Sequence, residues 1–141
     1  MDSRLDQLAP DLAAVLHAAD DRRLRRAAEV ACSLALAASG LREPRADAAF
    51  DRLRAGSVGD SSERNELWKL AEWLDGVQRH LDQAFGPDDQ RRRRTFAMAR
   101  AATAVWVALA ADPLYAALEC LYEAYHAGVE LEMLRSVVTT A

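Results

Sequence analysis

The chain has 141 residues, of which 51% are hydrophobic, and it carries a net charge of −4 at pH 7. A chain of this length can bury a core without disulfide or metal support, so we expect one domain over residues 1–141. About a fifth of the residues are Ala and none is Ile, which favours helices over strands. We therefore predict an all-α fold, a compact bundle of about six to seven helices.

The acidic net charge makes nucleic acid and anionic membranes unlikely partners, because domains that bind them are usually basic. Charged residues such as Asp2 and Arg4 interrupt the start of the chain, so we expect no signal peptide and a cytoplasmic protein. The longest apolar stretch, Thr95–Ala111, contains Arg100 and is too short and too weakly apolar to span a bilayer.

The first forty residues predict two helices. Apolar residues at helical spacing indicate a first helix over residues 2–19, with Pro10 either near a helix start or at a kink. Asp20 is a suitable N-cap for a second helix, which runs to Ser39. Gly40 then suits the position just after the helix, where a left-handed backbone is common.

A third helix is predicted to open at Pro44, because proline is favoured in the first helical turn. This helix should carry Ala48, Ala49 and Leu53 inward and stop at Gly56. Residues 57–62 read as a loop, since Ser and Gly dominate them.

A fourth helix should begin at Asp60, with Glu63 completing a capping box. It continues to Phe85, and its core-facing positions follow three- and four-residue steps: Leu67, Leu70, Leu74, Val77, Leu81 and Ala84. We expect Trp73 to pack at the edge of this stripe. Trp68 should face away from the core, because it lies well off the stripe on helical geometry.

The last part of the chain predicts three further helices. The fifth covers residues 89–111, the sixth runs from Pro113 to Gly128, and a short seventh covers 131–138. The second and fifth helices are the most uniformly apolar, so we expect them at the centre of the bundle.

An Asp-Asp pair, an arginine run, an Ala-rich stretch and a proline occur twice in this order, about 68 residues apart. The copies begin at Asp20 and Asp88 and end at Pro44 and Pro113. The pattern suggests two pseudo-repeated three-helix units followed by a C-terminal helix.

The two arginine runs are the first candidates for a binding surface: Arg22, Arg23, Arg25, Arg26, Arg91, Arg92, Arg93 and Arg94. One interpretation is that they pair with neighbouring carboxylates and cover apolar surface with their stems. The other is that they receive an acidic partner, a phosphate or a nucleic acid, for which the planar guanidinium is suited. Further candidates are Trp68 and an acidic face formed by Glu63, Glu66 and Glu72.

The sequence contains no catalytic or cofactor motif. Glu123 and His126 have the spacing used in di-iron bundles, but the second such pair is missing, and an exposed helix end is the expected setting. Cys32 and Cys120 are expected to be reduced, buried core residues. We expect no metal, no cofactor and no enzymatic activity.

The Ala-rich stretches and the residues that follow them form a pattern that can be compared with known protein families: Ala27, Ala28, Ala31, Cys32, Pro44, Arg45, Ala48, Arg52, Gly56, Ala99, Arg100, Ala101 and Ala102. In these positions the chain resembles Ala-rich helical immunity proteins of bacterial polymorphic toxin systems. Those proteins tend to carry histidines in their second half, where this chain has Thr103, Val105 and Ala108. The resemblance implies a small cytoplasmic protein that acts by binding a partner and catalyses no reaction.

We therefore predict a non-catalytic protein-interaction module, either immunity-like or an adaptor. One alternative is binding of an anion or nucleic acid through the two Arg clusters. Another is a small ligand held between the central helices near Trp106 and Tyr122. Self-association through residues 131–138 or around Trp68 is left open.

Overall fold

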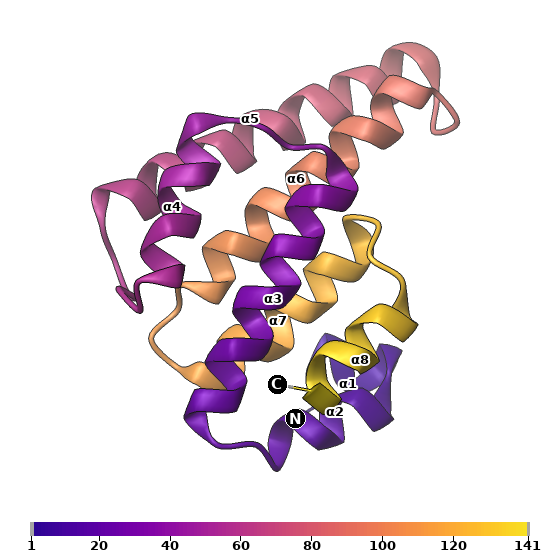
Figure 1. The fold of residues 1–141 in the computed structure, drawn as a ribbon. Coiled ribbons are helices and arrows are strands. Elements are labelled where there is room, and N and C mark those ends of the chain that lie inside the picture. The colour runs from indigo at the N-terminus through magenta and orange to yellow at the C-terminus, as the bar shows by residue number, and fades with distance from the viewer. Residues whose placement is uncertain (1, 141) are drawn as a thin grey trace.

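A computed structural model describes residues 2–140 of the chain. Eight helices and no strands lie within this range: α1 (Arg4–Leu8), α2 (Pro10–His17), α3 (Asp21–Ser39), α4 (Pro44–Arg54), α5 (Ser62–Phe85), α6 (Gln90–Ala108), α7 (Pro113–His126) and α8 (Leu131–Thr140). They form a compact bundle (Figure 1), which confirms the all-α prediction.

The first predicted helix is two helices, because Pro10 starts α2 rather than kinking a longer helix. Ala9 separates α1 from α2 with a non-helical backbone, φ −146°. A proline lacks the N–H that would continue the helix and clashes with the preceding turn. At the start of α1, Ser3 and Asp6 bond each other's backbone in a capping box.

The other helix starts are set by caps close to those predicted. Asp20 accepts a hydrogen bond from the backbone N–H of Arg23 at 2.9 Å, and Gly40 ends α3 with φ 72°. The expected cap at Asp60 is wrong by one residue. Ser61 caps α5 by accepting from the backbone N–H of Arg64 at 3.0 Å, since a serine hydroxyl caps a helix as well as a carboxylate does.

Helix α6 packs against α3, α5 and α7, and α7 also packs against α1 and α3. The bundle centre therefore holds α7 as well as the two helices predicted there. Figure 1 shows α3 and α6 running in opposite directions, with α1, α2 and α8 gathered at one end. Alanines fill most buried positions of α6, and small side chains let neighbouring helices approach closely.

Helix α5 is less buried than its apolar stripe predicts. Leu67, Leu70 and Leu74 are buried, whereas Val77 and Leu81 are half-buried and Ala84 is exposed. The reason is tertiary: the far half of α5 forms a hairpin with α6 that extends beyond the other helices (Figure 1).

Three further expectations about packing are corrected. Trp73 is 61% exposed and does not pack at the edge of the stripe, because it lies on the outer side of the α5–α6 hairpin. Ala48 is exposed, and α4 buries Ala46 instead, about one turn before Ala49 on its inner face. Leu134, Val137 and Val138 of α8 turn inward and are buried, whereas Met133 is exposed.

The proposed duplication stays a prediction. The proline-started helices of the two copies occupy different places, since α7 lies inside the bundle and α4 lies at its edge against α5 and α6. Among the helices described, none is both long and apolar enough to cross a membrane.

Candidate interaction surface

The C-terminal end of α6 is capped by an arginine from the first cluster. Arg25 donates hydrogen bonds to the carbonyl oxygens of Ala108 at 3.2 Å, Ala110 at 2.8 Å and Ala111 at 2.7 Å. The last carbonyls of a helix lack partners within it, and they form its negative pole. Arg25 thus satisfies this end of α6 and fixes the start of α3 beside it.

Two further groups hold the same end of α6 from the other side. Arg64 donates from Nε to the carbonyl of Trp106 at 3.1 Å, and its guanidinium stacks over the Trp106 ring at 4.2 Å. The backbone N–H of Gly59 donates to the carbonyl of Leu109 at 2.7 Å. The loop over residues 55–61 is therefore anchored to α6.

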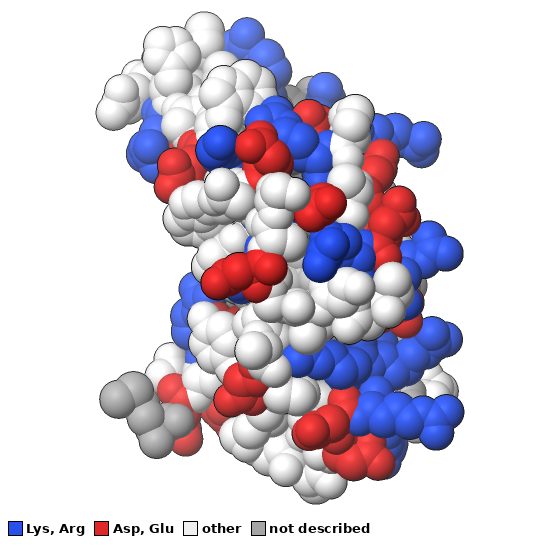
Figure 2. Space-filling model, turned by 90° about the vertical axis from the view of Figure 1, so that its left-hand side faces the viewer, with Lys and Arg blue, Asp and Glu red and all other residues white. Residues whose placement is uncertain are grey.

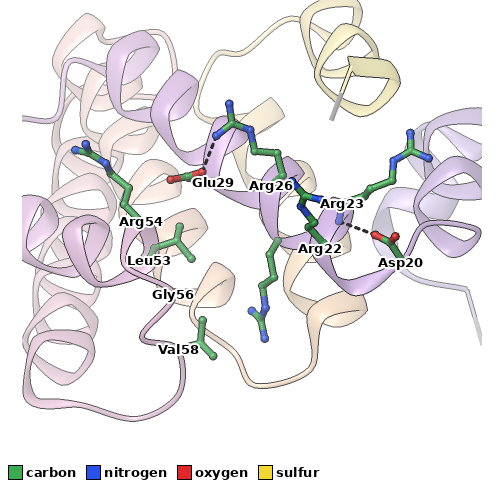
Figure 3. A pocket seen from close by; sticks show the side chains of 10 residues that line it. Asp20, Arg22, Arg23, Arg26, Glu29, Leu53, Arg54, Gly56 and Val58 are labelled. Carbon is green, nitrogen blue, oxygen red and sulfur yellow. Dashed lines mark hydrogen bonds and ion pairs between the residues drawn. The ribbon is translucent and has the colours of Figure 1, made fainter.

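A groove of about 740 Å³ opens between the start of α3 and the end of α4. It is lined by Asp20, Arg22, Arg23, Arg25, Arg26, Glu29, Leu53, Arg54, Gly56 and Val58, and we call it the Arg groove. Figure 3 shows Leu53, Arg54 and Val58 on one side, opposite the side chains of α3. Five arginines against two carboxylates give the groove a positive lining.

The arginines of the groove differ in how they are engaged. Arg25 is committed to the carbonyls of α6. Arg26 pairs with Glu29 at 3.1 Å and Arg54 with Asp51 at 3.8 Å, and the side chains of both arginines are more than 60% exposed. Exposed ion pairs of this kind contribute little stability, because water solvates each charge nearly as well. Their guanidinium groups can therefore turn to a carboxylate brought by a partner.

Figure 2 shows one face of the molecule, the left side of Figure 1. Lys and Arg side chains gather in a band near its lower end, the end at which α3 begins, while acidic and basic side chains alternate above the band. The positive potential is thus local, in a protein whose net charge is −4.

A second recess, of about 570 Å³, lies beside two tryptophans. The rings of Trp68 and Trp106 are 4.7 Å apart between centroids and tilted by 41°. Asp60, Ser61, Ser62, Arg64 and Asn65 complete the lining, and we call it the Trp recess. Trp68 is 40% exposed, so the expectation that it faces away from the core is confirmed.

The Arg groove and the Trp recess meet at the anchored loop. Val58 lines the groove and Asp60 lines the recess. Residues two apart in a chain have Cα atoms no more than about 7 Å apart. The Arg groove, which the first Arg cluster lines, and the Trp recess, which Trp68 lines, therefore border the same loop.

The second Arg cluster lies elsewhere, at the start of α6. This helix has 19 residues, so its two ends are about 28 Å apart. Arg91 pairs with Asp89 at 3.2 Å and stacks over Phe85 at 4.2 Å, and Arg92 pairs with Asp82 at 3.4 Å. Arg93 and Arg94 are exposed. The two clusters do not form one patch.

The predicted acidic face is spread along α5. Glu63 pairs with Arg52 at 3.6 Å, Glu66 pairs with Lys69 at 3.1 Å, and Glu72 is exposed. Backbone and side-chain hydrogen bonds at the helix start lower the pKa of Glu63. None of these three carboxylates lines the Arg groove or the Trp recess.

A charged network inside the bundle escaped the sequence analysis. Glu123 is only 2% exposed, and it accepts hydrogen bonds from Arg100 at 3.0 Å and Arg4 at 3.2 Å. Arg100 also binds Asp75 at 2.9 Å. The expected exposed helix end at Glu123 is therefore wrong. The signal was present in the sequence, because Arg100 interrupts the apolar stretch Thr95–Ala111 and Glu123 lies among the apolar residues of α7.

The remaining chemically interesting residues take structural positions. The ring of His126 is surrounded by Phe96, Tyr122 and Tyr125. In the part of the chain that the structure describes, no group of acidic, His and Cys side chains could hold a metal ion. Trp106 lies under Arg64 and Tyr122 under Arg4, so the two rings suggested for a small-ligand cavity have separate surroundings.

Cys32 and Cys120 are both free and fully buried, with their sulfur atoms 3.3 Å apart between α3 and α7. Burial raises the pKa of Cys32 well above its ordinary value, so this thiol stays protonated and unreactive.

No protein-family model, no curated protein and no solved structure matches this chain.

Proposed function

We propose that this protein is a non-catalytic interaction module that binds an acidic segment of a partner protein in the Arg groove. The observation that supports this most directly is the positive lining of the groove in an acidic protein. Arg25 is occupied in holding the fold together. Arg26 and Arg54 keep exposed guanidinium groups, which are suited to bidentate bonds with carboxylates.

The cost of placing arginines at the start of a helix supports the same proposal. Cations in the first turns face the positive pole of α3, an arrangement that costs up to about 1 kcal/mol per charge. Arg25 compensates for its own charge by reaching the negative pole of α6. Arg22 makes no such contact with the end of another helix, and it is exposed at the second position of α3. A bound carboxylate would add to the negative charge that Asp20 and Asp21 already place at this helix start.

A partner protein agrees better with the remaining surface than a nucleic acid does. The net charge of −4 repels a long polyanion, whereas a short acidic segment meets only the local positive band. The resemblance to immunity proteins of toxin systems supports an immunity-like role, in which the groove would cover a toxin's acidic surface. An adaptor role uses the same contact.

The proposal is tested by titrating the protein with a fluorescently labelled oligoglutamate peptide at low and at moderate salt. We expect saturable binding that weakens as salt screens the contact. The double variant Arg22→Glu/Arg26→Glu should bind at least about tenfold more weakly, equivalent to about 1.4 kcal/mol. Glutamate at these positions faces the positive pole of α3, so the variant is expected to fold.

The second Arg cluster provides a matched control. Arg93→Glu/Arg94→Glu changes the net charge by the same amount at the far end of α6, and we expect its affinity to stay within about twofold of the parent. An equal loss of peptide affinity in both double variants would mean that binding depends only on the net charge of the protein, and it would contradict a specific site in the Arg groove. Tighter binding of single-stranded DNA or RNA than of the peptide would favour the nucleic-acid alternative.

A further inference from the structure

The Trp recess is an aromatic surface whose two rings are already held in place by neighbouring side chains. The Trp106 ring contacts the Arg64 guanidinium, at 4.2 Å, and the Trp68 ring, at 4.7 Å between ring centroids. Arg64 is held in turn by Asp60 at 3.0 Å and by the Trp106 carbonyl. A ligand therefore meets rings already held in place, so little conformational entropy is lost on binding.

The recess and the Arg groove border the same anchored loop. Val58, which lines the groove, and Asp60, which lines the recess, are separated by at most about 7 Å between Cα atoms. The linings of the groove and the recess therefore approach each other at this loop. The hydrogen bond from Gly59 to Leu109 keeps the loop against α6, and the relative position of the two sites is fixed with it.

We infer that the Trp recess is a second subsite of this surface, which takes an aromatic side chain from the same acidic segment that occupies the Arg groove. The inference rests on the proposed function and names the partner's chemistry more closely: carboxylates flanking an aromatic residue. Charge complementarity places the carboxylates over the arginines. The exposed part of Trp68 offers an edge-to-face or stacked contact to the aromatic ring, and tryptophan is the residue type most enriched at binding hot spots.

The test compares two labelled peptides on the full chain. One is an oligoglutamate with a central Phe flanked by glutamates on both sides, so that either chain direction can place the ring in the recess. The other has Ala in place of Phe. We expect the Phe peptide to bind the parent protein about fivefold more tightly than the Ala peptide.

Two tryptophans of α5 give a matched pair of variants. Trp68→Ala should abolish the preference for the Phe peptide, and Trp68→Phe should restore part of it. Trp73→Ala should leave the preference unchanged, because Trp73 is more exposed than Trp68 and lines neither the groove nor the recess. Far-UV circular dichroism and thermal unfolding confirm that each variant is folded.

The outcomes separate the two proposals. If the Ala peptide binds and depends on Arg22 and Arg26, but Phe adds no affinity, the second subsite is refuted and the groove stands. If Trp68→Ala and Trp73→Ala reduce the preference equally, the subsite is also refuted. If neither peptide binds, both proposals fail. Binding of oligothymidine that depends on Trp68 and exceeds that of the Phe peptide would assign the surface to nucleic acid.

Discussion

Removing the carboxylate of Glu123 should destabilise the fold more than removing any exposed acid. This side chain is buried between α6, α7 and α1, and it bonds Arg100 and Arg4. Glu123→Ala removes both bonds and leaves a small cavity. Glu119 is a suitable control, because it lies one turn earlier on α7 and pairs with the same Arg4, whose side chain is 52% exposed.

The loss of unfolding free energy depends on which carboxylate partners Arg100 and Arg4 retain in the variant. Breaking a buried ion pair costs about 3–5 kcal/mol when the remaining charge has no other partner. Here Arg100 keeps Asp75 and Arg4 keeps Glu119, so we expect the lower end, about 3 kcal/mol. For a chain of this size that corresponds to a fall in Tm of roughly 10 °C. Glu119→Ala breaks a half-exposed pair and should cost about 1 kcal/mol at most.

The assay is equilibrium unfolding in urea, followed by far-UV circular dichroism, with thermal scans of the same variants. Glu123→Gln keeps the shape and removes the charge, and it should cost about 2 kcal/mol. A loss below about 1 kcal/mol for Glu123→Ala, similar to that of Glu119→Ala, would refute the reasoning. It would mean that the buried carboxylate does not hold α6, α7 and α1 together.

Three other predictions follow from the described contacts. Arg25→Met should cost about 2 kcal/mol of unfolding free energy in urea, because it leaves three carbonyls at the end of α6 without their donor; Arg25→Lys should restore only part, and full restoration would show that charge alone is needed. Hydrogen bonds from Ser3 lower the pKa of Asp6, so the stability that the charged carboxylate contributes is present above the unfolded-state pKa and is lost as pH falls below about 4. Below that pH the stability advantage of the parent over Asp6→Asn should shrink in pH-dependent melts, and a difference independent of pH would contradict the assignment. Cys32 and Cys120 should not react with a thiol reagent in the native protein and should both react after denaturation, whereas fast native labelling would show that they are not buried.

Local signals in the sequence were sufficient for most of the fold. Asp20, Asp89, Pro44 and Pro113 mark helix starts through interactions within one turn. Such interactions depend only on neighbouring residues, so they can be recognised without the tertiary structure. The N-cap of α5 was predicted at Asp60 and lies at Ser61. Both residue types are good N-caps, so the choice between them depends on the backbone conformation in the folded protein.

Burial depended on contacts that local sequence does not encode. The stripe of α5 continues to Ala84 in the sequence, yet only its first half meets the bundle. Glu123 looked like a helix-end charge because its partners Arg100 and Arg4 come from distant segments. A charge within an apolar helix is a better guide, because charged side chains are almost never fully buried unless they are paired.

The candidate site was predicted in parts and assembled by the fold. Trp68 and the first Arg cluster were each identified from residue type and position. The loop over residues 55–61 borders both the Arg groove and the Trp recess, and Arg25 and Arg64 each bond backbone carbonyls near the end of α6. The second Arg cluster has the same sequence signature but lies at the far end of that helix, beside the α5–α6 hairpin.

The most direct measurement is an NMR titration of isotope-labelled protein with the Phe-containing oligoglutamate peptide. We predict chemical-shift changes that cluster at residues 20–29 and 53–60 and at the indole N–H of Trp68, with none at residues 91–94. Changes centred on residues 91–94, or spread evenly over all exposed arginines, would contradict a specific acidic-segment site in the Arg groove.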